Sequence, residues 1–98
     1  MNGIRKPQVD ALFDAILSLR NREECYRFFE DVCTVREVQD IAQRLDVARQ
    51  LSRGRNYSEV SSLTGASSAT ICRVNKCLVY GAGGYREIIE RMDGNKEK

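Results

Sequence analysis

The sequence predicts an all-α fold of six helices in a single domain, residues 1–98. Apolar residues recur at spacings of three and four along almost the whole chain, which is the repeat of amphipathic helices. The chain has no Trp and only one Pro, the residue that interrupts the interior of a helix. A length of 98 residues favours one domain over two.

Three helices are expected before residue 53. Pro7 opens the first, over about residues 7–19, because its missing N–H has no helical role at that position. Asn21 with Glu24, and Thr34 with Glu37, have the spacing of capping boxes, which start the second helix and a third over 35–52. Gly54 ends the third. The apolar stripes are Val9, Leu12, Phe13, Ile16 and Leu17, then Cys25, Phe28, Phe29, Val32 and Cys33, then Val38, Ile41, Leu45, Ala48 and Leu51.

The first two apolar stripes are wide for such short helices. A chain this small has little other apolar surface against which they could be buried. We therefore expect residues 7–52 to be the dimerisation helices of a homodimer. A compact monomeric bundle is the alternative.

Residues 56–78 have the pattern of a helix-turn-helix. Asn56 and Glu59 fit a capping box, and Val60 and Leu63 give the first of the two helices an inward side. Gly65 stands at the turn, where a positive φ is needed. An ordinary helical hairpin is the alternative for this part of the pattern.

The second helix of this motif is expected to begin after Ser67, which can cap it. Its apolar side repeats at spacings of three and four. Its other side begins with short or hydrogen-bonding side chains that suit close approach to base edges. The apolar side is Ile71, Val74 and Leu78, and the other side is Ser68, Ala69, Thr70 and Arg73.

Charge is divided unevenly along the chain. Residues 8–42 hold four Lys or Arg against eight Asp or Glu, whereas residues 43–86 hold seven against two. The basic half contains the helix-turn-helix, which suits a polyanionic partner. Basic residues that merely solvate exposed faces are the alternative.

A glycine-rich bend over residues 80–85 separates the motif from a C-terminal helix over 85–92, and residues 93–98 are expected to fray. The bend is not a phosphate loop, because no Lys-Ser or Lys-Thr follows it and a helix precedes it. We interpret it as a flexible hinge that lets the last helix fold back.

Several classes of function are disfavoured. The chain has no His, no nucleophile–base pair and no cysteine spacing typical of zinc, so we expect no enzyme, no metal and no cofactor. No apolar run approaches a membrane span, and the N-terminus lacks a signal peptide's apolar core, so a cytoplasmic protein is expected. The four cysteines should then be reduced and act as small core side chains: Cys25, Cys33, Cys72 and Cys77.

The sequence resembles the Trp repressor superfamily, and within it the YerC/YecD branch of Trp repressor-like proteins. The stretches that carry the resemblance are residues 43–51, the Gly-Ala-Ser-Ser-Ala-Thr-Ile-Cys-Arg run at 65–73, and the Tyr-Gly-Ala-Gly-Gly-Tyr bend at 80–85. The resemblance implies an intertwined, all-helical dimer. Its two helix-turn-helix units would meet successive major grooves of two-fold operator DNA.

The resemblance also implies an effector pocket. Members that respond to tryptophan hold its indole between two arginines, and Arg44 and Arg73 stand at the matching positions. Thr34 matches a pocket threonine, but Val74 replaces a glycine and Cys77 replaces the serine that receives the amino group. Pocket leucines are replaced by Asp31 and Cys33. These departures argue against tryptophan, and leave a different small effector or none.

The sequence therefore predicts a homodimeric, sequence-specific regulator of transcription that binds double-stranded DNA and acts as a repressor. A helical protein-interaction module without specific DNA binding is the alternative. Phosphate contacts are expected from Arg53, Arg55, Asn56 and Lys76, and base contacts from Ser67, Ser68, Ala69 and Thr70, with Arg73 at the edge.

Overall fold

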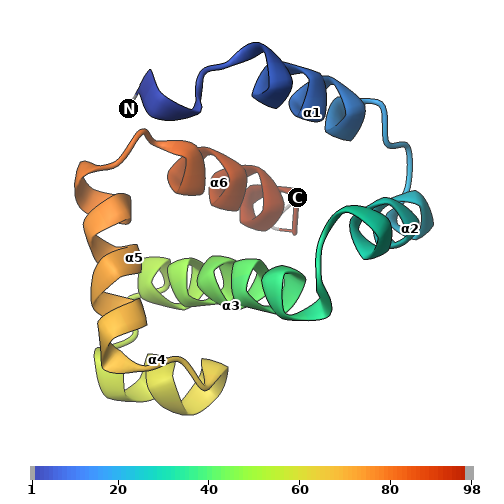
Figure 1. The fold of residues 1–98 in the computed structure, drawn as a ribbon. Helices are drawn as coiled ribbons and strands as arrows, with labels where there is room; N and C mark the ends of the chain where they lie inside the picture. The colour runs from blue at the N-terminus through green and yellow to red at the C-terminus, as the bar shows by residue number, and fades with distance from the viewer. Residues whose placement is uncertain (1, 97–98) are drawn as a thin grey trace. The chain divides into compact units, whose positions relative to one another are not determined.

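The computed structural model describes residues 2–96, with side chains for residues 3–94. The predicted all-α class with six α-helices is confirmed for this part of the chain (Figure 1). None of these helices is both long and apolar enough to cross a membrane. The elements are a 3-10 turn at Asn2–Ile4, α1 Pro7–Leu17, α2 Arg22–Val32, α3 Val35–Ser52, α4 Tyr57–Thr64, α5 Ser68–Tyr80 and α6 Gly84–Lys96.

Internal contacts divide the chain into two units, Met1–Val38 and Gln39–Lys98. We call them the N-terminal unit and the helix-turn-helix unit and describe each by itself. The division falls inside α3 rather than in a loop.

In the N-terminal unit, α1 begins at Pro7 as predicted but ends at Leu17, two residues early. The Ser18 hydroxyl donates to the Ala15 carbonyl at 2.6 Å and so occupies an acceptor of the last turn. The box expected before α2 is half formed. Asn21 accepts from the Glu24 N–H at 2.8 Å, but the Glu24 carboxylate accepts from the Arg20 N–H at 2.9 Å, one residue further back.

The box at the start of α3 is complete. The Thr34 N–H donates to the Glu37 carboxylate at 2.7 Å, and the Glu37 N–H donates to the Thr34 hydroxyl at 3.1 Å. The backbone and hydroxyl of Thr34 hold the pKa of Glu37 below its usual 4.5, because both bonds favour the carboxylate. This stabilisation is present above the unfolded-state pKa and is lost as pH falls through the folded-state pKa.

Neither α1 nor α2 contains a buried residue. Leu17 is 82% exposed, Val32 52% and Phe13 47%. Phe28 and Phe29 are half-buried and pack edge to face, with ring centroids 5.4 Å apart. The two amphipathic helices of this unit therefore leave much of their apolar surface in contact with water.

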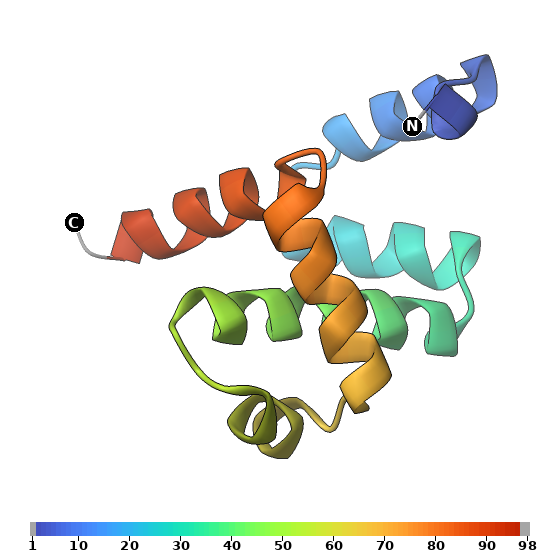
Figure 2. The same ribbon diagram turned by 90° about the vertical axis from the view of Figure 1, so that its left-hand side faces the viewer.

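The helix-turn-helix unit holds every buried side chain of the described residues. The cluster draws on α3, α4, the turn after α4, α5 and α6, and α5 crosses α3 (Figure 2). Burying an aliphatic side chain of this size contributes roughly 1.5–3 kcal/mol. Its members are Val47, Ala48, Val60, Ala66, Ile71, Val74 and Ile89, with Leu45, Leu51, Leu78 and Tyr85 partly buried around them.

The predicted helix-turn-helix geometry is confirmed in its local details. Asn56 and Glu59 form a reciprocal capping box, with bonds of 3.0 and 2.9 Å. Gly65 ends α4 with φ +76°, and Ser67 caps α5 by accepting from the Thr70 N–H at 3.2 Å. The prediction that Leu63 faces inward is wrong, because its side chain is 56% exposed. It lies about 60° round the helix from the buried Val60.

The last helix is longer than predicted. Gly83 turns the chain with φ +90°, and α6 runs over Gly84–Lys96 instead of ending near residue 92. Residues 93–96, expected to fray, are helical, and residues 97–98 lie outside the described range. Ile89 is buried, whereas Ile88 is 43% exposed. Asp93, which lies beyond the predicted end of the helix, forms an ion pair with Arg49 of α3.

We expect Gly65→Ala to cost about 1–2 kcal/mol of unfolding free energy, because an L side chain resists the positive φ of the turn. A steric clash does not contribute to this cost, since an added Cβ would meet only Gln43 Nε2, at 3.9 Å. Gly94→Ala, within α6 and with open space around it, is the matched control and should be neutral or stabilising. Denaturant unfolding at one protein concentration measures both. Equal effects of the two substitutions would contradict the left-handed turn.

Candidate nucleic-acid interface

The outward face of α5 is a stripe of exposed side chains opposite the buried Ile71 and Val74. The stripe follows spacings of four, three and four along the helix. Arg73 and Lys76 were predicted from sequence, but Cys72 and Tyr80 were not, although the same spacing marks them. The stripe consists of Ala69, Cys72, Arg73, Lys76 and Tyr80, and the exposed Ser68, Cys77 and Val79 lie beside it.

The electrostatics of α5 favour an anion. The helix carries two cations, Arg73 and Lys76, and no acidic residue. Its N-terminus adds the positive end of the helix dipole, with no acid in the first turn to offset it. A polyanion that runs along this face would therefore meet positive charge at the N-terminus of α5 and at Arg73 and Lys76.

The first turn of α5 offers fewer outward polar groups than predicted. The Ser67 hydroxyl accepts from the Thr70 N–H at 3.2 Å and donates to the Thr70 hydroxyl at 3.1 Å. Thr70 is also half-buried, whereas Ser68 and Ala69 are exposed. Ser67 is also exposed, but its hydroxyl caps the helix, so Ser68 and Ala69 are the exposed members of the predicted base-contacting set that lie outside the cap.

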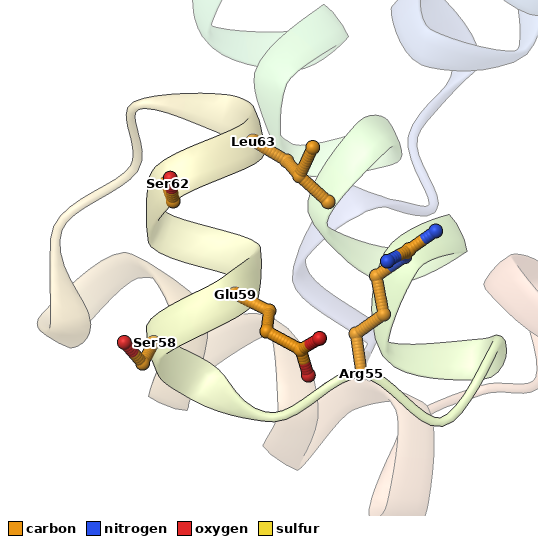
Figure 3. A pocket seen from close by; sticks show the side chains of 5 residues that line it. All are labelled: Arg55, Ser58, Glu59, Ser62 and Leu63. Atoms are coloured by element: carbon orange, nitrogen blue, oxygen red, sulfur yellow. The ribbon is translucent and has the colours of Figure 1, made fainter.

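Arg55 lies just before α4 and lines an open hollow with residues of that helix (Figure 3). Its side chain and that of Leu63 extend along the same side of α4, with Glu59 between them, while two serines lie on the other side (Figure 3). Within the described side chains Arg55 forms no ion pair. Asn56 is exposed, but its side chain accepts the capping hydrogen bond from the Glu59 N–H. The two serines, not predicted as contacts, are Ser58 and Ser62.

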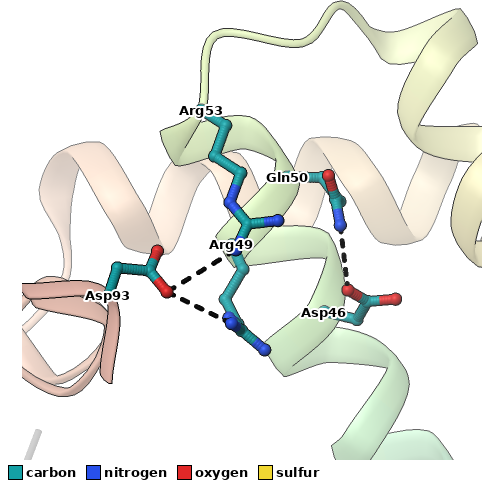
Figure 4. A network of polar contacts seen from close by, with 5 residues as sticks. All are labelled: Asp46, Arg49, Gln50, Arg53 and Asp93. Carbon is teal, nitrogen blue, oxygen red and sulfur yellow. Dashed lines mark hydrogen bonds and ion pairs between the residues drawn. The ribbon is translucent and has the colours of Figure 1, made fainter. Parts of the chain in front are cut away.

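Arg53 differs from Arg55 because it is paired. One of its terminal nitrogens lies 3.6 Å from an oxygen of Asp93, and the same oxygen lies 3.1 Å from a terminal nitrogen of Arg49 (Figure 4). Asp46 accepts from Gln50 at 3.2 Å in the same region (Figure 4). Of the two arginines predicted to contact phosphates before α4, only Arg55 lacks a carboxylate partner among the described residues.

The residues proposed for an effector pocket fall in both units. Thr34 belongs to the N-terminal unit, where its hydroxyl accepts from the Glu37 N–H. In the helix-turn-helix unit Arg44 is half-buried, and Arg73 and Cys77 are exposed. Val74 is 1% exposed and belongs to the core cluster.

The cysteines are free thiols, and the prediction that all four lie in a core is wrong. Cys25 and Cys33 are half-buried, but Cys72 and Cys77 are exposed. The physical reason is their place on α5, where the buried side is already occupied by Ile71 and Val74. Among the described residues no group of three or more cysteine or acidic side chains could hold a metal ion.

Comparison with known proteins places these features in a family. The family described as Trp repressor protein matches residues 7–93 of the chain. YerC of Bacillus subtilis, an uncharacterized protein, is 51% identical over 92 residues, which cover 94% of this chain and 88% of YerC.

Two solved structures are similar in fold and in sequence. A candidate Trp repressor from Staphylococcus aureus superposes with a TM-score of 0.90 at 48% identity, covering 94% of this chain and 92% of its own. A TrpR-like protein from Eubacterium eligens superposes with a TM-score of 0.91 at 46% identity, covering 95% of this chain and 96% of its own. The similarity therefore extends over nearly the whole length of each protein.

Proposed function

The chain belongs to the Trp repressor family of DNA-binding regulators, and we propose that it is a sequence-specific repressor that binds two-fold operator DNA as a homodimer. The observation that carries this proposal is α5, which presents an exposed face with two cations and no acid. This helix follows a glycine turn typical of a helix-turn-helix.

The position of each residue indicates whether it would contact phosphates or base edges. Arg55 precedes α4, and Lys76 lies well along α5, so both suit phosphates and would set affinity and register. Ser68 and Ala69 lie in the first turn of α5, the part of a recognition helix that reaches base edges. Arg73 lies between these two groups.

The exposed apolar surface of α1 and α2 supports the homodimer. Leu17, Phe13 and Val32 are large apolar side chains that two short helices leave exposed to water, and a second copy would cover them. Two helix-turn-helix units held in this way would meet half-sites about one helical turn apart, roughly 34–36 Å. Two-fold symmetry of the protein would then be matched by two-fold symmetry of the operator.

An experiment decides between this proposal and a helical interaction module without specific DNA binding. Duplexes selected from random DNA, and scrambled versions of them, are titrated by fluorescence anisotropy across a salt series. Specific binding predicts a preference for the selected duplex of about 1,000-fold or more. Equal affinity for both duplexes at every salt concentration would favour the interaction module.

Phe28→Asp should abolish the dimer, at a cost of about 3 kcal/mol or more, because it buries an unpaired charge on the apolar face of α2. Arg27→Asp is the control, since it places the same carboxylate on the polar face, where an exposed pair with Glu23 is lost. Sedimentation velocity at micromolar concentration reads both variants. A stable monomer of the unmutated protein would refute the dimer.

Arg55→Ala should weaken binding to all sequences about equally and reduce the slope of log affinity against log salt by roughly one unit. Ala69→Gln should instead change the ranking of sequences by about 1–3 kcal/mol per affected base pair, with the salt slope nearly unchanged. Anisotropy with the selected duplex and single-base variants measures both effects. If Ala69→Gln weakens every duplex equally, α5 does not read bases.

Tryptophan should give no saturable heat in titration calorimetry at millimolar ligand. Val74 fills the position of a glycine with a buried branched side chain, and the Cys77 thiol is a weak partner for an ammonium group. Arg44→Ala is the control that would separate pocket binding from surface binding. Tight binding that Arg44→Ala abolishes would show that the pocket is open to tryptophan despite Val74.

A further inference from the structure

A single carboxylate on α6 holds two arginines of α3 and the segment that follows it. An Asp93 oxygen lies 3.1 Å from Arg49 and 3.6 Å from Arg53 (Figure 4). The side chains of Arg49 and Asp93 are 20% and 27% exposed, whereas that of Arg53 is 42% exposed. The pair with Arg49 is thus shorter and more buried, and the contact with Arg53 faces water.

We propose that Asp93 is a positioning residue that holds Arg53 back from DNA phosphates and neutralises part of its charge. The inference rests on the proposed function only in that duplex DNA binds through the basic side of the helix-turn-helix unit. It gives Arg53 and Arg55 different roles, although they flank the same glycine. While Asp93 is paired with Arg53, Arg55 contacts phosphate and Arg53 does not.

The geometry explains why Asp93 does not simply yield Arg53 to an incoming phosphate. Asp93 is fixed by Arg49, whose charge would lose its partner in a half-buried place if the carboxylate moved. The helix that carries Asp93 is held in turn by Ile89, which lies in the core cluster. The carboxylate therefore stays beside Arg53, where it attracts the guanidinium and repels a phosphate.

The consequence is a link between the docking of α6 and affinity for DNA. While α6 is docked, the three side chains carry a net charge of +1, from two arginines and one aspartate. If Asp93 loses its charge or α6 moves away, the local charge rises to +2 and Arg53 can make its own phosphate contact. The docked C-terminal helix therefore weakens DNA binding through the charge of Asp93.

The test is the salt dependence of DNA binding by four proteins: unmutated, Asp93→Asn, Arg53→Ala and the double variant. Asp93→Asn should tighten binding to any duplex by roughly two- to fivefold, the worth of one exposed ion pair. It should also steepen the salt slope by roughly one unit. Arg53→Ala should change little by itself, and in the double variant it should remove the whole gain.

Arg49→Met is the matched control, because it breaks the Asp93–Arg49 pair but keeps the Asp93 charge, so the net charge of the three positions falls to zero instead of rising to +2. It should not tighten binding. Thermal unfolding separates the proposal from a merely structural role, since a structural role of Asp93 predicts that Asp93→Asn lowers stability and DNA affinity together. The proposal predicts tighter binding even where the midpoint of unfolding falls.

Weaker or unchanged binding by Asp93→Asn would overturn the proposal. So would a full one-unit loss of slope in Arg53→Ala alone, because it would show that Arg53 already contacts phosphate. These readings do not depend on sequence preference, since the salt slope reports phosphates on a scrambled duplex as well as on a selected one. Equal affinity for the two duplexes would end the sequence-specific proposal and leave this test readable. Absence of binding to any duplex by any of the four proteins would contradict both the proposed function and the proposed role of Asp93.

Discussion

The burial of a few aliphatic side chains where α3, α4, α5 and α6 meet is the interaction on which the rest of the structure depends. Among residues 3–94, whose side chains are described, the seven buried residues lie from Val47 to Ile89, and they hold α5 against its neighbours. The N-terminal unit has no comparable core, since neither α1 nor α2 buries a residue. We infer that its folding depends on surface supplied by a second chain, because two exposed amphipathic helices bury too little to offset the entropy of ordering them.

The same constraint links folding to function. A second copy would cover the apolar faces of Phe13, Leu17 and Val32 and hold two recognition helices at a fixed separation. DNA binding by a lone helix-turn-helix unit would gain from half as many phosphate contacts and lose the symmetry of the operator. The exposed apolar surface and the basic face of α5 are in this view two parts of one binding unit.

Much of the fold could be predicted because its signals are local. The box of Asn56 and Glu59, the turn at Gly65 and the start of α3 at Val35 each depend on residues within four positions along the chain. Burial could not be predicted as well, because it depends on contacts between distant segments. Leu63 has the periodicity of an inward residue but lies outside the core, and helix α6 continues past Met92.

The candidate interface shows the same limit. From sequence, Arg53 and Arg55 are equivalent cations on either side of Gly54. The structure separates them, because Asp93, from the distant helix α6, pairs with Arg53. Likewise, the hydroxyl of Thr70 is a plausible base contact until its bond to Ser67 and its partial burial are seen. The spacing of apolar residues along α5 did indicate that Arg73 and Lys76 are exposed, because exposure on a helix follows from its period.

We propose that two chains, joined through their N-terminal helices, form one DNA-binding unit. Sedimentation equilibrium of the unmutated protein on a selected duplex tests it most directly, because it gives the number of 11.2 kDa chains in the complex. We expect two chains for each duplex, with no complex of one chain at any protein concentration. A complex of a single chain that binds the selected duplex at full affinity would contradict it.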